Sequence, residues 1–375
     1  MKISLLDLKG QYYSIKKEMD EAIAGVLESQ YFILSPEVAA LEKEVSEYTG
    51  VSFGVGVASG TDAIILALKA SGIGRGDRVI TTPFTFFATA ESISILGAVP
   101  VFVDINPETY NIDPKKVEEL LLETQKRDNA EFKAIKAILP VHLYGQCADM
   151  DPIMAIADKY ELTVIEDCAQ AMGAVYKGKK AGSFGLAGAF SFFPSKNLGG
   201  FGDGGMVVSS DKVFMELVKK LRVHGSSKQY VHDLIGHNSR LDSLQAAILR
   251  VKLKKLDTWL ERRREIASKY NKAFSKSNKI VTPKTAEGNV HTYHQYTLSV
   301  SDRDGMLSYL REKGIAARVY YPVPMHFQPC YKDLGYKEGD FPVSENACKK
   351  VFSLPVYPEL TEDMIQYVID TVLAF

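Results

Sequence analysis

The sequence predicts an α/β protein with a mostly parallel central sheet in a large domain and a smaller α+β domain at the C-terminal end. Two observations support this. Short apolar segments alternate with helical ones from residue 53 to about residue 168, which is typical of crossover units whose helices cover both faces of a parallel sheet. The chain also has 375 residues, more than one ordinary core accommodates. We therefore expect a large domain over residues 1–243 and a small domain over residues 244–375.

Composition limits the function classes. The chain has 45 basic and 46 acidic residues and a net charge of -1, which argues against a nucleic-acid groove or a membrane-attracted surface. The cysteines show no paired C-x-x-C spacing, which argues against a zinc site and a disulfide-stapled secreted scaffold. The N-terminal stretch is too charged for a signal peptide, and no segment is long enough to span a membrane. We expect a cytoplasmic protein.

The N-terminal region predicts two helices before the first strand. One spans about residues 14–29, and the second begins at Ser35-Pro36, where proline is favoured in the first helical turn. A buried strand then leads into Ser59 and an apolar helix. The following strands are expected at residues 78–83, 99–105, 134–145 and 163–168, and the helices at residues 86–98, from 114 and 149–160.

The second half of the chain predicts a strand over residues 204–210 and a helix ending near residue 223. A long amphipathic helix is expected over residues 241–271 and could join the two domains. Strand-like segments at residues 294–300 and 315–321, with helices after Asp302 and from Thr361, then indicate the smaller α+β domain.

The segment 191–205, SFFPSKNLGGFGDGG, carries a single lysine from an apolar run into a glycine-dense turn. Partial desolvation of Lys196 would lower the pKa of its ammonium group and leave neutral amine available to form a Schiff base with an aldehyde. The alternative is a surface lysine in a flexible loop.

Three strand ends are candidate ligand sites, because ligands of parallel sheets bind at the carboxyl ends of the strands. They are residues 59–61, 85–89 and 166–170. At the first end, Gly60 and Thr61 begin a helix and could bind a phosphate through N–H groups and a hydroxyl, with Ser191 adding a second hydroxyl. The alternative is a simple N-cap.

The other two strand ends offer an acid and an aromatic ring. Asp167 could keep a pyridine nitrogen protonated, which makes the ring an electron sink, and Phe86 could stack on that ring. The alternatives are a capping or surface carboxylate and a core phenylalanine. Together with Lys196 and the anion site, these residues match the requirements of pyridoxal phosphate.

The sequence also resembles the DegT/StrS sugar aminotransferases over nearly its whole length. The matching motifs are ASGTDAIILAL, PFTFFATAE, VFVDI, PVHLYGQCADM, VIEDCAQAMGA, SFFPSKNLGGFGDGG, GHNSRLDSLQAAIL and RVYYPVPMHFQPCY. The family has the aspartate aminotransferase fold, so the resemblance implies a pyridoxal-phosphate-dependent transferase of fold type I.

The resemblance implies roles for the residues at the cofactor. Lys196 would hold the cofactor as a Schiff base and later move a proton between the cofactor and substrate carbons. Asp167 would pair with the pyridine nitrogen, Gln170 would lie beside the ring, and Phe86 would stack on it. A branch of the family that dehydrates its substrate has histidine in place of this lysine, so Lys196 favours amino transfer.

The remaining implied roles concern the phosphate, a second subunit and the substrate. Gly60, Thr61 and Ser191 would hold the phosphate. Asn238 would reach the phosphate of the neighbouring subunit's cofactor, which requires a homodimer. Tyr321 and His326 lie in a motif that the family places near the sugar, although the alternative for PVPMHFQP is a rigid proline-bounded turn.

The implied reaction is amino transfer from a donor, expected to be L-glutamate, to the keto carbon of a nucleotide-linked sugar. The motifs are most similar to those of 3-keto-sugar aminotransferases, acting on a dTDP-3-keto-6-deoxyhexose or a UDP-3-keto sugar. The alternatives are a 4-keto-sugar aminotransferase, a non-catalytic cofactor-binding regulator and a nicotinamide-dependent dehydrogenase. Asp104 at a strand end suggests the dehydrogenase, but the chain lacks a suitably placed G-x-G-x-x-G motif.

Overall fold

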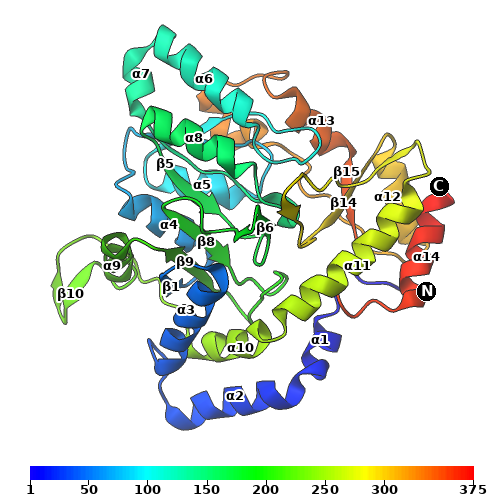
Figure 1. Ribbon diagram of the computed structural model, residues 1–375, viewed down its shortest axis with the longest axis horizontal. Helices are drawn as coiled ribbons and strands as arrows, with labels where there is room; N and C mark the ends of the chain where they lie inside the picture. The colour runs from blue at the N-terminus through cyan, green and yellow to red at the C-terminus, as the bar shows by residue number, and fades with distance from the viewer.

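A seven-stranded sheet forms the centre of the larger part of the molecule, and the computed structural model describes residues 1–375 (Figure 1). The strands lie in the order β1-β9-β8-β5-β4-β2-β3. β9 is antiparallel to both of its neighbours, and all other neighbouring strands are parallel. The bounds are β1 Phe53–Val57, β2 Arg78–Thr81, β3 Val99–Phe102, β4 Ile135–Ile138, β5 Thr163–Asp167, β8 Ala187–Ser191 and β9 Gly205–Ser209. The predicted mostly parallel sheet is therefore confirmed.

Helices cover both faces of this sheet. The helices on one face are α4 (Gly60–Ala70), α5 (Phe87–Ile95) and α9 (Lys212–Leu221), and those on the other are α3 (Pro36–Thr49), α6 (Pro114–Arg127), α8 (Met150–Tyr160) and α10 (Ser243–Leu253). Successive side chains of a strand point to opposite faces. Ile165 therefore packs in the core under α4, α5 and α9, and Val164 packs in the core under α3, α6, α8 and α10. Burial on both sides explains why these strands are almost continuously apolar.

The single helix predicted over residues 241–271 is wrong, because the chain forms two helices there. α10 is followed by residues 254–255 and then by α11 (Leu256–Phe274). α10 packs on α2 (Lys16–Ser29) and on α3 of the larger part, whereas α11 extends away from it (Figure 1). Along α11, Leu260 still packs in a core of the large sheet, but Ile266 packs in the core of a smaller sheet. The break lets the two helices direct their apolar faces to these different partners.

The smaller sheet is antiparallel and has the order β12-β14-β15. Its strands are β12 Ile280–Val281, β14 Tyr296–Val300 and β15 Val351–Leu354. They share a core with the C-terminal half of α11 and with the helices α12 Arg303–Glu312 and α14 Glu362–Leu373. Ile3 also belongs to this core and pairs with Ile315. The strand predicted over residues 315–321 forms only isolated bridges, because residues 319–321 turn into the wall of a cavity. The division of the chain at residues 243 and 244 stays a prediction.

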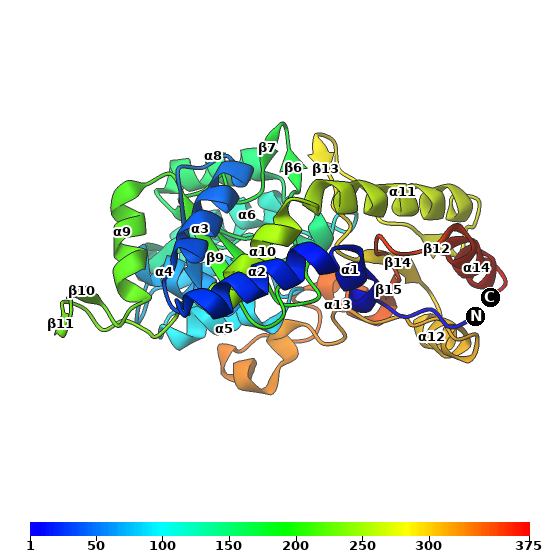
Figure 2. The same ribbon diagram turned by 90° about the horizontal axis from the view of Figure 1, so that it is seen from below.

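The remaining elements connect these parts. They are α1 Leu8–Ser14, α2 Lys16–Ser29, α7 Asn129–Ala134, α13 Pro342–Lys350, β6 Val175–Tyr176, β7 Lys179–Lys180, β10 Ser226–Lys228, β11 Val231–His232, β13 Asn289–Val290 and the 3-10 helices Leu143–Gly145, Met325–Phe327 and Pro329–Leu334. β13 pairs with β6, so a segment beyond α11 joins a strand of the larger part. The β10-β11 hairpin projects from the body in both views (Figures 1 and 2). No helix has both the length and the apolar composition that crossing a lipid bilayer requires.

Candidate active site

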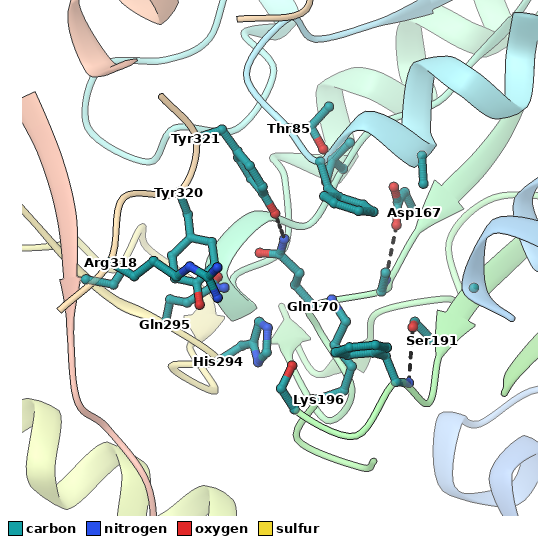
Figure 3. A pocket seen from close by; sticks show the side chains of 18 of the residues that line it. Thr85, Asp167, Gln170, Ser191, Lys196, His294, Gln295, Arg318, Tyr320 and Tyr321 are labelled. Atoms are coloured by element: carbon teal, nitrogen blue, oxygen red, sulfur yellow. Dashed lines mark hydrogen bonds between the residues drawn. The ribbon is translucent and has the colours of Figure 1, made fainter. Parts of the chain in front are cut away.

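A cavity of about 570 Å³ opens where the carboxyl ends of the parallel strands face the smaller sheet. All three strand ends selected from the sequence contribute to its wall. The lining residues from these ends are Ser59, Gly60, Thr61, Thr85, Phe86, Ala88, Asp167, Ala169 and Gln170. Lys196 and Ser191 complete this side of the cavity (Figure 3). The fold therefore brings together residues that are more than one hundred positions apart in the sequence.

Asp167, the last residue of β5, is 4% exposed and is held by two hydrogen bonds. The Thr89 hydroxyl donates to its Oδ2 at 2.7 Å, and the backbone N–H of Ala169 donates to its Oδ1 at 3.1 Å. Burial raises the pKa of the Asp167 carboxyl, while these hydrogen bonds and the charge of Lys196 act in the opposite direction. The carboxylate is thus fixed in position and lacks a full counter-charge, which suits it to a cationic ligand atom.

Lys196 lies in the turn after β8, where its backbone N–H donates to the carbonyl of Phe193 at 2.8 Å. The glycines that follow allow the chain to fold back closely, since a Cβ at Gly199 would lie 2.4 Å from the carbonyl oxygen of Pro194. Burial lowers the pKa of the Lys196 amine to about 8, and the nearby Asp167 charge partly opposes this shift. A neutral amine at near-physiological pH is the form that attacks an aldehyde.

The start of α4 has the features of an anion site. Ser59 acts as the N-cap, its Oγ accepting from the backbone N–H of Asp62 at 3.1 Å, so the capping alternative is correct for this residue. Gly60 and Thr61 occupy the next two positions, where backbone N–H groups have no partner within the helix. A Cβ at Gly60 would lie 2.5 Å from the Cβ of Ser191, so glycine is needed for this close approach.

Gln170 and two aromatic residues, Phe86 and Tyr321, form a further part of the cavity wall. The backbone N–H of Tyr144 donates to Gln170 Oε1 at 2.8 Å, and Gln170 Nε2 donates to the Tyr321 hydroxyl at 2.8 Å. The Phe86 ring is 56% exposed and lies 6.1 Å from the Tyr321 ring. An exposed aromatic face on a cavity wall is available to stack on a planar ligand.

Comparison with known proteins identifies the family. The family described as the DegT/DnrJ/EryC1/StrS aminotransferase family matches residues 13–373. The chain belongs to this family.

Individual relatives match this chain over almost the full length of both sequences. A pleiotropic regulatory protein of Geobacillus stearothermophilus is 48% identical, covering 100% of this chain and 99% of its own. A UDP-N-acetyl-3-dehydro-alpha-D-glucosamine 3-aminotransferase of Acidithiobacillus ferrooxidans is 43% identical, covering 97% and 95%. The solved structure of S. venezuelae DesV in complex with a ketimine intermediate is 40% identical with a TM-score of 0.94, covering 99% and 97%.

Family membership confirms the predicted fold type I, the aminotransferase activity class and pyridoxal phosphate as the cofactor. The residues present fit this cofactor, because the chain places a lysine of lowered pKa, a buried carboxylate and a glycine cradle at one cavity. The dehydrogenase alternative is excluded. Asp104 instead binds the start of α13, accepting from the N–H groups of Val343 and Ser344, both at 2.9 Å.

Two of the predicted site residues of this chain lie outside the cavity. Asn238 is exposed and its side chain makes no hydrogen bond within its own chain. If Asn238 contacts a cofactor, that cofactor would have to be the one bound by another subunit. His326 is 3% exposed and packs against Phe341, with its Nε2 3.2 Å from Glu345 Oε1. This placement favours the rigid-turn interpretation of the segment, and a sugar contact by His326 stays a prediction.

The buried pair of His142 and Glu166 was not predicted from the sequence and lies on the other face of β5 from Asp167. Glu166 points to the opposite face of β5 and accepts from His142 Nε2 at 2.9 Å and from the N–H groups of Gly182, Phe184 and Gly185 at 2.7 to 2.9 Å. Both side chains of the pair are fully buried. The consecutive acids at 166 and 167 were a usable signal, because neighbouring residues of a strand face opposite ways.

The wall formed by the smaller sheet was also missed. Four residues that line the cavity from this side are labelled in Figure 3: His294, Gln295, Arg318 and Tyr320. Ser353 of β15 lines it as well. The polar pair before the apolar strand at 296–300 was a possible signal, but nothing local connects it with the cofactor residues far earlier in the chain.

Proposed function

We propose that the protein transfers the amino group of L-glutamate to the C3 keto carbon of a nucleotide-linked sugar. The observation that carries the proposal is the arrangement of Lys196, of lowered pKa, with Asp167 and Gly60 around one cavity. The substrate class is supported by the names of relatives at 40 to 43% identity, which include UDP- and dTDP-linked 3-amino-sugar or 3-keto-sugar aminotransferases.

The chain's own residues divide the chemistry between them. Pyridoxal phosphate, when bound, supplies the electron sink that stabilises negative charge at the amino-bearing carbon. Lys196 holds the cofactor and moves a proton at its Nζ, since a pKa near 8 lets it both accept and donate near neutral pH. Asp167 holds positive charge at the ring nitrogen, Phe86 and Gln170 orient the ring, and Gly60, Thr61 and Ser191 bind the phosphate.

The proposal includes a homodimer. Asn238 lies in the segment between α9 and α10, outside its own cavity, and is exposed. An exposed amide with no partner in its own chain is suited to contact the cofactor phosphate of a second copy. Tyr321 is placed in the cavity and is proposed to contact the sugar.

Two other functions compete with this proposal. A 4-keto-sugar substrate would use the same residues, because nothing in the described cavity selects one keto position. A regulatory role is favoured by the name of the relative at 48% identity, a pleiotropic regulatory protein. A protein with that role alone would bind the cofactor without turning over an amino sugar.

One experiment separates these functions. The purified holoenzyme is incubated with L-glutamate and a panel of 3-keto and 4-keto nucleotide sugars, and NMR identifies the aminated carbon. Lys196→Ala should fold and lose turnover, whereas Lys212→Ala, which removes an exposed lysine on α9, should behave as wild type. Amination at C4 would replace the 3-keto proposal. Cofactor binding without amination of any sugar, or full turnover by Lys196→Ala, would overturn it.

A further inference from the structure

An unpaired arginine faces the cavity from the smaller sheet. Arg318 is the only arginine that lines the cavity, and it forms no salt bridge and no side-chain hydrogen bond. The two carboxylates in the wall, Asp167 and Asp203, are not paired with it. Its guanidinium lies 5.9 Å from the centre of the Tyr320 ring, a contact that leaves its N–H donors free.

The backbone holds Arg318 firmly beside the smaller sheet. Its N–H donates to the Ser353 carbonyl at 3.2 Å, and the Ser353 N–H donates back to the Arg318 carbonyl at 2.7 Å. Ser353 is itself part of β15, which pairs with β14 through Thr297. The backbone of Arg318 is therefore tied to the edge of β15 by an isolated bridge.

Two further polar side chains on this wall are buried and lack partners. His294 and Gln295 are each 9% exposed, and neither His294 Nδ1 nor Gln295 Oε1 has a hydrogen-bond partner. Burying polar atoms without partners costs free energy, so such atoms in a cavity wall indicate a ligand that completes them. His294 Nδ1 can donate to an anion when it carries the ring proton, whereas Gln295 Oε1 only accepts and is suited to a ligand hydroxyl. In Figure 3, Arg318 and Gln295 lie on one side of the cavity and Asp167 and Ser191 on the other, with Lys196 and Gln170 between them.

We propose that Arg318 binds a carboxylate of the substrate, with His294 Nδ1 on the same cavity wall as a second donor. The guanidinium offers two parallel N–H donors that match the two oxygens of a carboxylate. This inference rests on the proposed function, because amino transfer brings carboxylates into this cavity. Two sources share the chemistry, namely the amino donor and a sugar that carries a carboxylate in place of its hydroxymethyl group.

The test measures binding to the holoenzyme without turnover. Calorimetry gives the dissociation constants of three probes: glutarate, UDP-glucuronate and UDP-glucose. Glutarate represents the amino donor, and the two nucleotides differ in one carboxylate. The variants are Arg318→Gln, Arg318→Lys and the control Arg311→Gln, which removes an exposed arginine of α12 that does not line the cavity.

A donor carboxylate at Arg318 predicts that Arg318→Gln weakens glutarate about 10- to 100-fold and leaves both nucleotides unchanged. A sugar carboxylate predicts the same loss for UDP-glucuronate, with UDP-glucose unchanged. In either case Arg318→Lys should retain part of the affinity, because it keeps the charge but loses the paired donors. Arg311→Gln should match wild type.

The inference is overturned if Arg318→Gln changes neither carboxylate probe, if it weakens both nucleotides equally, or if wild type binds neither glutarate nor UDP-glucuronate. Circular dichroism of each variant checks that the fold is retained. Failure of the proposed function gives a different result, since wild type would then bind the probes but aminate no ketosugar.

Discussion

Thr89 and Asp167 lie 78 positions apart in the sequence and are joined by a 2.7 Å hydrogen bond from the Thr89 hydroxyl to the buried carboxylate. Thr89 belongs to α5, which packs on the large sheet, and Asp167 is the last residue of strand β5 of that sheet. The hydroxyl orients the carboxylate and stabilises its charged form, and it does not line the cavity. Thr89 is therefore a positioning residue.

We expect Thr89→Val to lower kcat about 10- to 100-fold, because a hydrogen bond to a charged group is lost without a change of shape. The cofactor's absorption spectrum should change as well, since the charge beside the ring nitrogen is less well held. Thr49→Val is the matched control, because Thr49 is also buried but its hydroxyl has no partner. Equal kcat values for the two variants would remove Thr89 from the machinery.

The lowered pKa of Lys196 predicts a pH dependence. Only the neutral amine reacts with acylating or arylating reagents, so labelling of Lys196 in the cofactor-free protein should rise as pH increases through about 8, well below the ordinary value of 10.5. Asp167→Asn removes the charge that raises this pKa and should move the midpoint lower. Peptide mapping after labelling at a series of pH values measures both midpoints. A midpoint near 10.5 would contradict the desolvation argument.

Breaking the buried His142–Glu166 pair is expected to lower the free energy of unfolding. Glu166→Ala should destabilise the fold by about 3 kcal/mol or more, because three backbone N–H groups and His142 lose their acceptor. The midpoint of urea unfolding measures the change. Glu123→Ala, which removes an exposed acid of α6, is the control and should stay within about 0.5 kcal/mol of wild type. Similar midpoints for both variants would show that the pair is not important for stability.

Asn238 predicts complementation between subunits. Asn238→Ala alone should weaken cofactor binding about 10-fold, through loss of a hydrogen bond to a charged phosphate. Mixed dimers of Asn238→Ala and Lys196→Ala chains contain one site with an intact lysine and an intact asparagine from the other chain. That site should bind the cofactor as tightly as wild type and restore part of the activity. A monomeric protein, or mixed dimers without regained activity, would exclude the contact between subunits.

The sequence predicted the strand-end residues well because the rule behind them is local. Each parallel strand leads directly into its ligand residues, as Val57 leads to Ser59 and β5 ends at Asp167. The periodicity of each segment therefore placed Gly60, Asp167 and Gln170 at one edge before the order of the strands was known. The antiparallel direction of β9 was not predicted, since an apolar strand reads the same in either direction.

Residues that act through long-range packing could not be predicted. Arg318 reaches the cavity only because its backbone pairs with Ser353, and no pattern near residue 318 encodes that pairing. The break between α10 and α11 was missed because both helices share a similar periodicity, and the change of packing partner decides where it occurs. His326 lies in a familiar motif, yet it is held in an aromatic cluster by Phe341.

The contact between Ile3 and Ile315 has a consequence for biosynthesis. The N–H of Ile3 donates to the Gly314 carbonyl at 2.9 Å, and the Ala316 N–H donates to the Ile3 carbonyl at 2.9 Å. A ribosome synthesises Ile3 long before residues 314–316, so the segment around Ile3 lacks this partner while the strands of the large sheet are being made. The contact between Ile3 and residues 314–316 therefore forms only after most of the large sheet has been synthesised.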